Sequence, residues 1–192
     1  MKKSIGRYKT KTAVFISGKG SNLKNLIKFS YKKNSPISIE LVISNKKNAN
    51  GLKYANQKKI EKKIINFIEP KKSEQKILSL LTKRKIKFIC LAGFMKILSS
   101  NFLKKFDGKV INIHPSLLPK YKGLNTHRRV LENNEKFSGC TVHYVSAKLD
   151  SGNIILQKKV KISKTDTEKT LKRNILRHEH KLYTNAIEKI FN

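Results

Sequence analysis

Short apolar runs alternate with amphipathic segments through the first 114 residues of the chain. The runs that predict strands lie at 12–17, 37–44, 63–68, 88–92 and 110–114. The amphipathic segments that predict helices lie at 23–31, 52–58 and 73–85. Strands that alternate with helices in this way form βαβ units, so we expect a parallel sheet with helices on both of its faces.

The periodicity changes in the last third of the chain. Gly139–Val145 and Asn153–Val160 read as strands joined by a turn, which predicts an antiparallel addition to the sheet. A final helix is expected from Asp166 to Phe191, with its cap at Asp166 or Thr167. The predicted fold class is therefore α/β: a Rossmann-like, mostly parallel twisted sheet with an antiparallel C-terminal addition. We expect one domain over residues 1–192, in which residues 1–11 form a basic, flexible lead-in.

Three loops are expected at the same edge of this sheet. Ligands of open parallel sheets bind at the carboxyl ends of the strands, because the connecting loops gather there. The segments 20–22, 93–98 and 112–114 all lie at predicted carboxyl ends, although they come from distant parts of the sequence. We therefore predict that they line one common site.

Length and composition fit a folded protein without covalent or metal cross-links. A chain of 192 residues can bury a core on its own. No apolar run approaches the roughly 18 residues of a membrane span, and the N-terminal stretch lacks the apolar core of a secretory signal. We therefore expect a cytoplasmic protein, with an organellar presequence as the less favoured alternative. Cys90 and Cys140 each lie in an apolar run, which indicates buried thiols, and no Cys/His cluster predicts a metal site.

Lysine dominates the charge of the chain, which has a formal net charge of +32. A charge of this size is typical of nucleic-acid binding, but only 6 of the 44 basic residues are arginines. Nucleic-acid binders usually gather arginine and aromatic side chains on one face, whereas these lysines are spread along the whole chain. A compositional bias toward lysine explains the charge better than a specific nucleic-acid site. The positive field would also attract small anionic substrates.

A glycine-rich turn, G-K-G-S-N at 18–22, joins the first predicted strand to the first predicted helix. Backbone N–H groups at the start of the helix could converge there on an anion, for which phosphate is the natural candidate. Ser21 and Asn22 would add side-chain donors or a helix cap. The turn lacks the Lys-Ser/Thr ending of a nucleotide P-loop and the third glycine of the dinucleotide fingerprint, so a purely structural turn is an equal alternative.

Asn112, His114 and Asp150 are the strongest candidates for chemistry. His114 ends a strand and precedes a proline, and histidine is suited to proton transfer near neutral pH. Asn112 would point to the same face of the strand and could donate a hydrogen bond to a carbonyl oxygen that becomes tetrahedral. Asp150 would hold the His114 ring if the two side chains approach. Each residue alone is explained more simply by a structural role, but together they indicate acyl-group chemistry.

The other four histidines have simpler explanations. His127 lies near an expected helix start, where a role in the cap region is favoured. His143 alternates with apolar residues in a predicted strand, which favours a structural role. His178 and His180 flank Glu179 on the last helix, where a charge pair on a solvated surface is the simplest interpretation.

Five motifs of the chain are similar to those of one known family. They are I-S-G-K-G-S-N-L at 16–23, L-A-G-F-M-K-I-L-S at 91–99, N-I-H-P-S-L-L-P-K-Y-K-G-L-N-T-H at 112–127, L-D-S-G-N-I-I-L-Q at 149–157 and E-H-K-L-Y at 179–183. By these motifs the chain resembles the phosphoribosylglycinamide formyltransferases of purine biosynthesis, also called glycinamide ribonucleotide transformylases. The long central motif is highly specific. It disfavours two families that share the fold, the methionyl-tRNA formyltransferases and the formyltetrahydrofolate deformylases.

The resemblance implies a formyltransferase fold and the transfer of a formyl group from 10-formyltetrahydrofolate to the amine of N1-(5-phospho-D-ribosyl)glycinamide. Asn112, His114 and Asp150 match the catalytic residues of the family. The residues that match its ribonucleotide contacts are Gly20, Ser21, Asn22 and Glu179. The residues that match its folate contacts are Lys72, Met95, Lys96, Ile97, Leu98, Asn112, Ser146, Ala147, Lys148, Leu149 and Asp150.

The resemblance implies that the chain binds two small-molecule substrates and acts without a metal. It implies no membrane partner and no specific nucleic-acid partner. We expect the protein to be a monomer or a weak homodimer. A related formyltransferase acting on another amine is the main alternative, and a basic nucleic-acid-binding module is a weaker one.

Three positions depart from the family. Lys96 stands where arginine is common and Asn125 where histidine is common, and Lys71 or Lys72 replaces an arginine expected before the Ser73 helix. A lysine keeps the charge but loses bidentate recognition of a carboxylate or phosphate.

Overall fold

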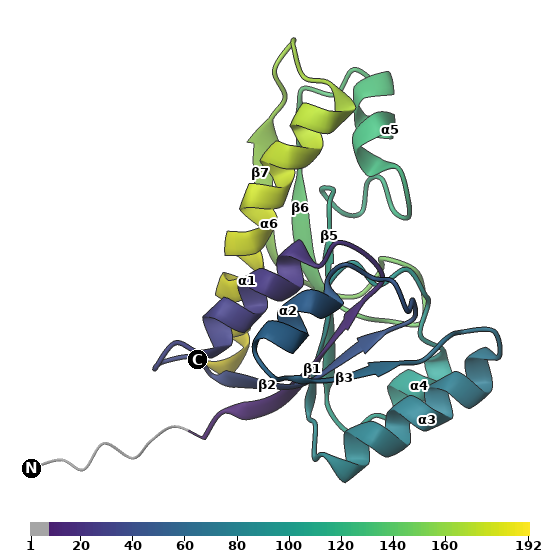
Figure 1. Ribbon diagram of the computed structural model, residues 1–192. Coiled ribbons are helices and arrows are strands. Elements are labelled where there is room, and N and C mark those ends of the chain that lie inside the picture. Colours follow the sequence, from purple (N-terminus) through teal and green to yellow (C-terminus); the bar gives the residue numbers. More distant parts are fainter. Residues whose placement is uncertain (1–7) are drawn as a thin grey trace, which may run out of the picture.

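The computed structural model describes residues 8–192, and within this range one seven-stranded sheet forms the centre of the molecule (Figure 1). The strands are β1 (Thr10–Ile16), β2 (Ile37–Ser44), β3 (Glu61–Ile64), β4 (Phe88–Leu91), β5 (Lys109–His114), β6 (Phe137–Tyr144) and β7 (Ile154–Lys161). The helices are α1 (Ser21–Ser30), α2 (Leu52–Gln57), α3 (Pro70–Lys83), α4 (Ser100–Lys105), α5 (Thr126–Glu132) and α6 (Glu168–Phe191).

The strand order is β3-β2-β1-β4-β5-β6-β7. The strands from β1 to β5 pair in parallel, while β6 and β7 are antiparallel to their neighbours. This arrangement confirms the predicted fold class, including the antiparallel addition.

Several predicted boundaries need correction. A flexible lead-in was predicted for residues 1–11. Residues 1–7 of it lie outside the described part of the chain, whereas Thr10 and Lys11 already belong to β1. Tyr31 lies just beyond the end of α1 and is 61% exposed, so it does not continue the apolar side of that helix. The third strand was expected at 63–68 but is β3 at 61–64, an edge strand with one neighbour and mostly exposed side chains. Weak burial leaves little apolar pattern to define such a strand.

Two helix starts were also misjudged. α3 begins at Pro70 rather than Ser73, since proline is well tolerated in the first turn of a helix. The short helix α4 had not been predicted. Its start is fixed by the Ser99 hydroxyl, which accepts a hydrogen bond from the Phe102 N–H at 3.0 Å.

The parallel strands are buried on both faces, as the continuous apolar runs predicted. Along β1, Val14 and Ile16 join one hydrophobic cluster, whereas Ala13 and Phe15 join the other. Residues of α1, α2, α5 and α6 complete the first cluster, and residues of α3 and α4 complete the second. In Figure 1, α1 and α6 accordingly lie on one side of the sheet and α3 and α4 on the other. The alternation of side chains along a strand therefore builds both layers of the core.

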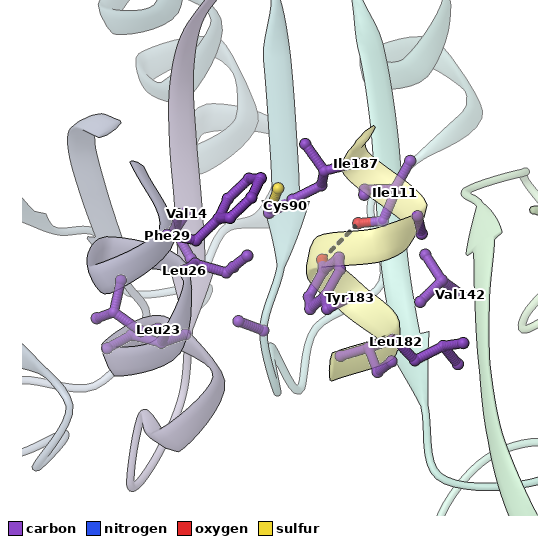
Figure 2. Packing of buried hydrophobic residues seen from close by; sticks show 14 of the residues in the cluster. Val14, Leu23, Leu26, Phe29, Cys90, Ile111, Val142, Leu182, Tyr183 and Ile187 are labelled. Atoms are coloured by element: carbon purple, nitrogen blue, oxygen red, sulfur yellow. Dashed lines mark hydrogen bonds between the residues drawn. The ribbon is translucent and has the colours of Figure 1, made fainter. Parts of the chain in front are cut away.

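Helix α6 fixes the strands that lead to the candidate site. It begins with a capping box, in which the side chains of Thr167 and Thr170 each bond the other residue's backbone N–H. Further along, the Tyr183 hydroxyl is fully buried and lies 2.9 Å from the Leu91 carbonyl oxygen of β4 and 3.3 Å from that of Ile111 in β5. Figure 2 shows this ring among the apolar residues between the helix and the sheet. One phenol thus links α6 to the end of β4 and to the middle of β5.

The two cysteines are fully buried, as expected. Burial raises the pKa of the Cys140 thiol to about 12 and also raises that of Cys90. Because the thiolate is the reactive form, we predict that both thiols of the folded protein react with a disulfide reagent at pH 8 at least ~100-fold more slowly than in the urea-unfolded chain. The absorbance of the coloured thiolate released from an aromatic disulfide reagent would measure both rates. Equal rates would contradict the burial of these side chains.

Within residues 8–192, no helix combines the length and the apolar character that a membrane crossing requires.

Candidate active site

The carboxyl ends of β1, β4 and β5 lie next to one another at one edge of the sheet. Phe15 of β1 is paired with Leu91 of β4, and Leu91 is paired with Asn112 of β5. Beyond these pairs, the Ser17 N–H donates to the Gly93 carbonyl oxygen at 3.1 Å, and the Met95 N–H donates to the Ser17 hydroxyl at 2.7 Å. The three predicted loops therefore occupy a common edge, and Ser17 joins the first two.

The glycine turn ends in a helix start without a side-chain cap. Gly20 is the N-cap residue of α1 and adopts a left-handed conformation with φ of 71°, so the predicted cap from Ser21 or Asn22 is wrong. The N–H groups of the first helical turn point toward the turn and have no partner within the helix. The N-terminal end of the helix dipole adds a partial positive charge. The geometry suits an anion such as a phosphate.

A second glycine lies against the back of this turn. The Gly51 N–H donates to the Gly18 carbonyl oxygen at 2.9 Å. A Cβ atom added to Gly20 would lie 2.4 Å from the Gly51 Cα atom, and one added to Gly51 would lie 2.8 Å from the Gly20 Cα atom. Only two glycines can approach this closely, so the start of α2 sets the position of the turn.

Glu179 is buried, which corrects its assignment to a solvated helix surface. Its Oε2 atom accepts a hydrogen bond of 2.7 Å from the Asn22 side chain, and both residues are less than 9% exposed. Burial raises the pKa of Glu179, although the Asn22 hydrogen bond and the nearby Lys172 ammonium act in the opposite direction. The contact links the start of α1 to a helix 157 residues later in the chain. The sequence alone could not indicate this pairing.

His114 and Asp150 form a buried pair at the end of β5. The His114 Nδ1 atom lies 3.3 Å from Asp150 Oδ2, and its Nε2 atom lies 2.8 Å from the Tyr121 carbonyl oxygen. Asp150 Oδ2 also accepts the Gly123 N–H at 2.9 Å. Because a carbonyl oxygen can only accept, Nε2 must carry a hydrogen. Nδ1 is then the ring nitrogen that faces the carboxylate.

Asn112 lies beside this pair and contacts a histidine to which the sequence had assigned only a structural role. Its Nδ2 atom is 3.3 Å from His143 Nε2, and the two residues are direct partners in the β5–β6 ladder. His143 Nε2 lies 3.7 Å from Asp150 Oδ1, and His143 Nδ1 lies 2.9 Å from the Tyr144 carbonyl oxygen. The antiparallel register brings His143 to the site, and correct pairing of the two strands would have been needed to predict it.

His127 lies in the first turn of α5, at the helix start that the sequence predicted, and it is buried. It is the second residue of α5, after the N-cap residue Asn125, and it is 8% exposed. Its Nδ1 atom has no hydrogen-bond partner among residues 8–192. Burial, with smaller effects of Lys172 and His114, lowers the pKa of His127 to about 4. The ring is therefore neutral at pH 7 and lies near the candidate trio.

The residues matched to folate contacts divide into exposed and buried groups. Met95, Ile97 and Leu149 are exposed by 58%, 65% and 50%, which is unusual for apolar side chains and leaves them available to a ligand. Leu98 is only 2% exposed and packs in the core, so only its backbone is available. In the loop after β6, Ala147 and Lys148 are exposed.

Lys72 lies inside α3 rather than in the loop before it, which corrects the predicted position. Its ammonium group is 2.6 Å from the Glu69 carboxylate, and its side chain is 70% exposed. Lys96 is likewise exposed. Neither position shows a contact that would define a role, so their assignment to the folate site stays a prediction.

The sequence matches the formyl transferase family over residues 10–187. The chain therefore belongs to the formyl transferase family, and this agrees with an edge at which an amide, an imidazole and a carboxylate meet. The similar proteins within this family include several named phosphoribosylglycinamide formyltransferase, which confirms the resemblance inferred from the motifs.

Three relatives illustrate the similarity. A phosphoribosylglycinamide formyltransferase of Haemophilus influenzae is 40% identical over 181 residues, which cover 93% of this chain and 85% of that protein. The crystal structure of a phosphoribosylglycinamide formyltransferase from Brucella melitensis superposes with a TM-score of 0.90 at 39% identity, over 95% of this chain and 96% of that one. The human trifunctional purine biosynthetic protein adenosine-3 is 42% identical over 188 residues, or 96% of this chain. The chain spans 19% of the length of that trifunctional protein.

Proposed function

We propose that this chain transfers the formyl group of 10-formyltetrahydrofolate to the amine of N1-(5-phospho-D-ribosyl)glycinamide, a step of purine biosynthesis. The observation that carries the proposal is the buried His114–Asp150 pair, which lies beside Asn112 at the same sheet edge as the glycine turn. The names of the relatives support the choice of both substrates.

The proposed reaction begins when the substrate amine attacks the formyl carbon, whose oxygen then gains negative charge. An N–H of the Asn112 amide and the protonated His114 ring would stabilise that oxygen. Asp150 holds the His114 ring in place through the contact at 3.3 Å. His114, or a water molecule beside Asp150, would carry the proton from the attacking amine to the departing folate nitrogen.

The two substrates would occupy opposite sides of this group. The first turn of α1 at Gly20, Ser21 and Asn22 would hold the phosphate of the ribonucleotide, and Glu179 would contact its glycinamide portion. The exposed apolar side chains of Met95, Ile97 and Leu149 would pack against the folate. The Ser146–Asp150 loop and Lys96 complete the proposed folate site. Lys72 is a further proposed contact to the folate. Positioning both substrates on one edge would contribute as much as the proton transfer.

A spectroscopic assay with 10-formyltetrahydrofolate tests the proposal directly. The rate at which the folate loses its formyl group would be compared with glycinamide ribonucleotide, with methionyl-tRNA and without an acceptor. Turnover is expected only with the ribonucleotide. Turnover with the tRNA alone would favour a related formyltransferase, and equal loss in all three reactions would indicate a hydrolase.

Replacing the glycine behind the phosphate turn should weaken ribonucleotide binding. The φ of Gly51 is −63°, which suits alanine, but the new Cβ atom would lie 2.8 Å from the Gly20 Cα atom and displace the turn. Overpacking of this kind typically costs about 1–3 kcal/mol, so Gly51→Ala is expected to raise the KM for the ribonucleotide about tenfold with a smaller change in kcat. Steady-state kinetics with each substrate varied would measure both constants.

Gly18→Ala is the matched control, because no atom lies within 4 Å of a Cβ atom at that glycine. Its KM is expected to equal that of the unmodified protein. A substrate analogue that lacks the phosphate should be used equally well by both variants. An unchanged ribonucleotide KM in Gly51→Ala would count against a phosphate site at this turn.

The same proposal extends to the organisation of the protein. We propose a single formyltransferase domain over residues 1–192, supported by the continuity of the sheet through the described residues. We further propose that the protein acts on two small-molecule substrates without a metal. It would be cytoplasmic, and it would be a monomer or a weak homodimer. Size-exclusion chromatography with light scattering would measure the oligomeric state.

A further inference from the structure

We propose that His143 is a positioning residue, which turns the Asn112 amide so that one of its N–H groups faces the reacting formyl oxygen. The inference rests on the proposed function, because that function supplies the reacting carbonyl. It goes beyond that function by giving a role to His143 of β6, which contacts Asn112.

The contacts of the His143 ring determine which of its nitrogens carries hydrogen. Nδ1 lies 2.9 Å from the Tyr144 carbonyl oxygen, an atom that can only accept, so Nδ1 carries the hydrogen. The ring is 2% exposed, and burial lowers the pKa of His143, so the ring is neutral at pH 7. A neutral ring with hydrogen on Nδ1 has only a lone pair on Nε2.

That lone pair selects one orientation of the Asn112 amide. Nε2 lies 3.3 Å from Asn112 Nδ2 and accepts one of its two hydrogens. Rotating the amide by half a turn would place its oxygen against the lone pair, which is unfavourable. The other hydrogen on Nδ2 stays free for the oxyanion. Without the acceptor, the amide could present its oxygen to the formyl oxygen, and two acceptors would then repel each other.

The position of Asp150 is consistent with this orientation. Its Oδ1 atom lies 3.7 Å from His143 Nε2, beyond a normal hydrogen bond, while its Oδ2 atom contacts His114 and the Gly123 N–H. The carboxylate is thus used by the proton-transfer residue, and the lone pair of His143 is left for Asn112. His114 therefore contacts Asp150, whereas His143 contacts Asn112.

Two amide substitutions separate the two ring nitrogens. In His143→Gln the side-chain oxygen can take the place of Nε2 and accept from Asn112, whereas His143→Asn can replace only Nδ1. His143→Asn is expected to lower kcat about tenfold or more, as a partial loss of an oxyanion donor, while His143→Gln should lose at most about threefold. The KM of each substrate should change by less than about twofold in both variants, because uniform binding is preserved.

A double-mutant cycle with Asn112→Ala completes the test. If His143 acts through Asn112, adding His143→Asn to Asn112→Ala should cause no further loss of kcat. Equal kcat in His143→Asn and the unmodified protein, equal losses in the Asn and Gln variants, or additive losses in the double variant would each overturn the inference. Circular dichroism melting confirms that every variant is folded. An unmodified protein without activity would instead refute the proposed function, so the two failures are distinguishable.

Discussion

Asp150→Asn is expected to lower kcat by about 100-fold or more while the protein stays folded. The Oδ2 atom of this carboxylate lies 3.3 Å from His114 Nδ1 and also accepts the Gly123 N–H at 2.9 Å. An amide at this position keeps the shape but presents one acceptor oxygen instead of two, and it removes the negative charge beside the His114 ring. The His114 ring would then lose the carboxylate that holds its orientation.

Single-turnover measurements with both substrates saturating would isolate this effect from binding. Asp107→Asn is a suitable control, because the Asp107 side chain is 91% exposed and pairs with Lys87 at the surface. Exposed ion pairs of this kind contribute little, so the control should keep its kcat and its melting temperature. A normal rate in Asp150→Asn would remove Asp150 from the proposed mechanism.

His114→Ala is expected to have an effect of similar size, about 100-fold or more on kcat. The substitution removes the imidazole ring that lies 3.3 Å from the Asp150 carboxylate, and it leaves that carboxylate buried beside an empty volume. Some loss of stability should accompany the change, because the Tyr121 carbonyl oxygen also loses its partner. Turnover and thermal melting therefore need to be measured together.

Added imidazole offers a way to separate the two effects. A free imidazole could fill the volume left in His114→Ala and restore part of kcat in proportion to its concentration. The gain should be absent in Asp150→Asn, where the ring is still present. Full activity of His114→Ala without imidazole would show that another group transfers the proton.

The hydrophobic pattern was sufficient for most of the fold. The runs at 37–44 and 88–92 were located almost to the residue, because buried strands of a parallel sheet are apolar on both faces. The pattern failed at β3, where an edge strand is largely exposed, and at α4, where six residues are too few to show a helical period. Burial creates the signal, so elements with little burial gave little of it.

The candidate trio could be proposed from the sequence because each residue lies at the end of a predicted strand or in the following turn. The glycine turn was also located, although its capping residue was not. The contacts that His143, Tyr121 and Gly51 make with the site were not predictable. Each depends on a pairing between segments that are brought together only in the folded chain.

The sequence by itself thus determined the α/β architecture, the sheet edge at which the candidate site lies and the residue types available there. The tertiary structure decided which nitrogen of His114 faces the carboxylate, that Glu179 is buried against Asn22, and that His143 accepts from Asn112. The physical reason is the range of the interactions. Periodicity and strand ends are set by neighbours along the chain, whereas hydrogen-bond partners and protonation states are set by atoms that only the packed sheet and α6 bring within 4 Å of one another.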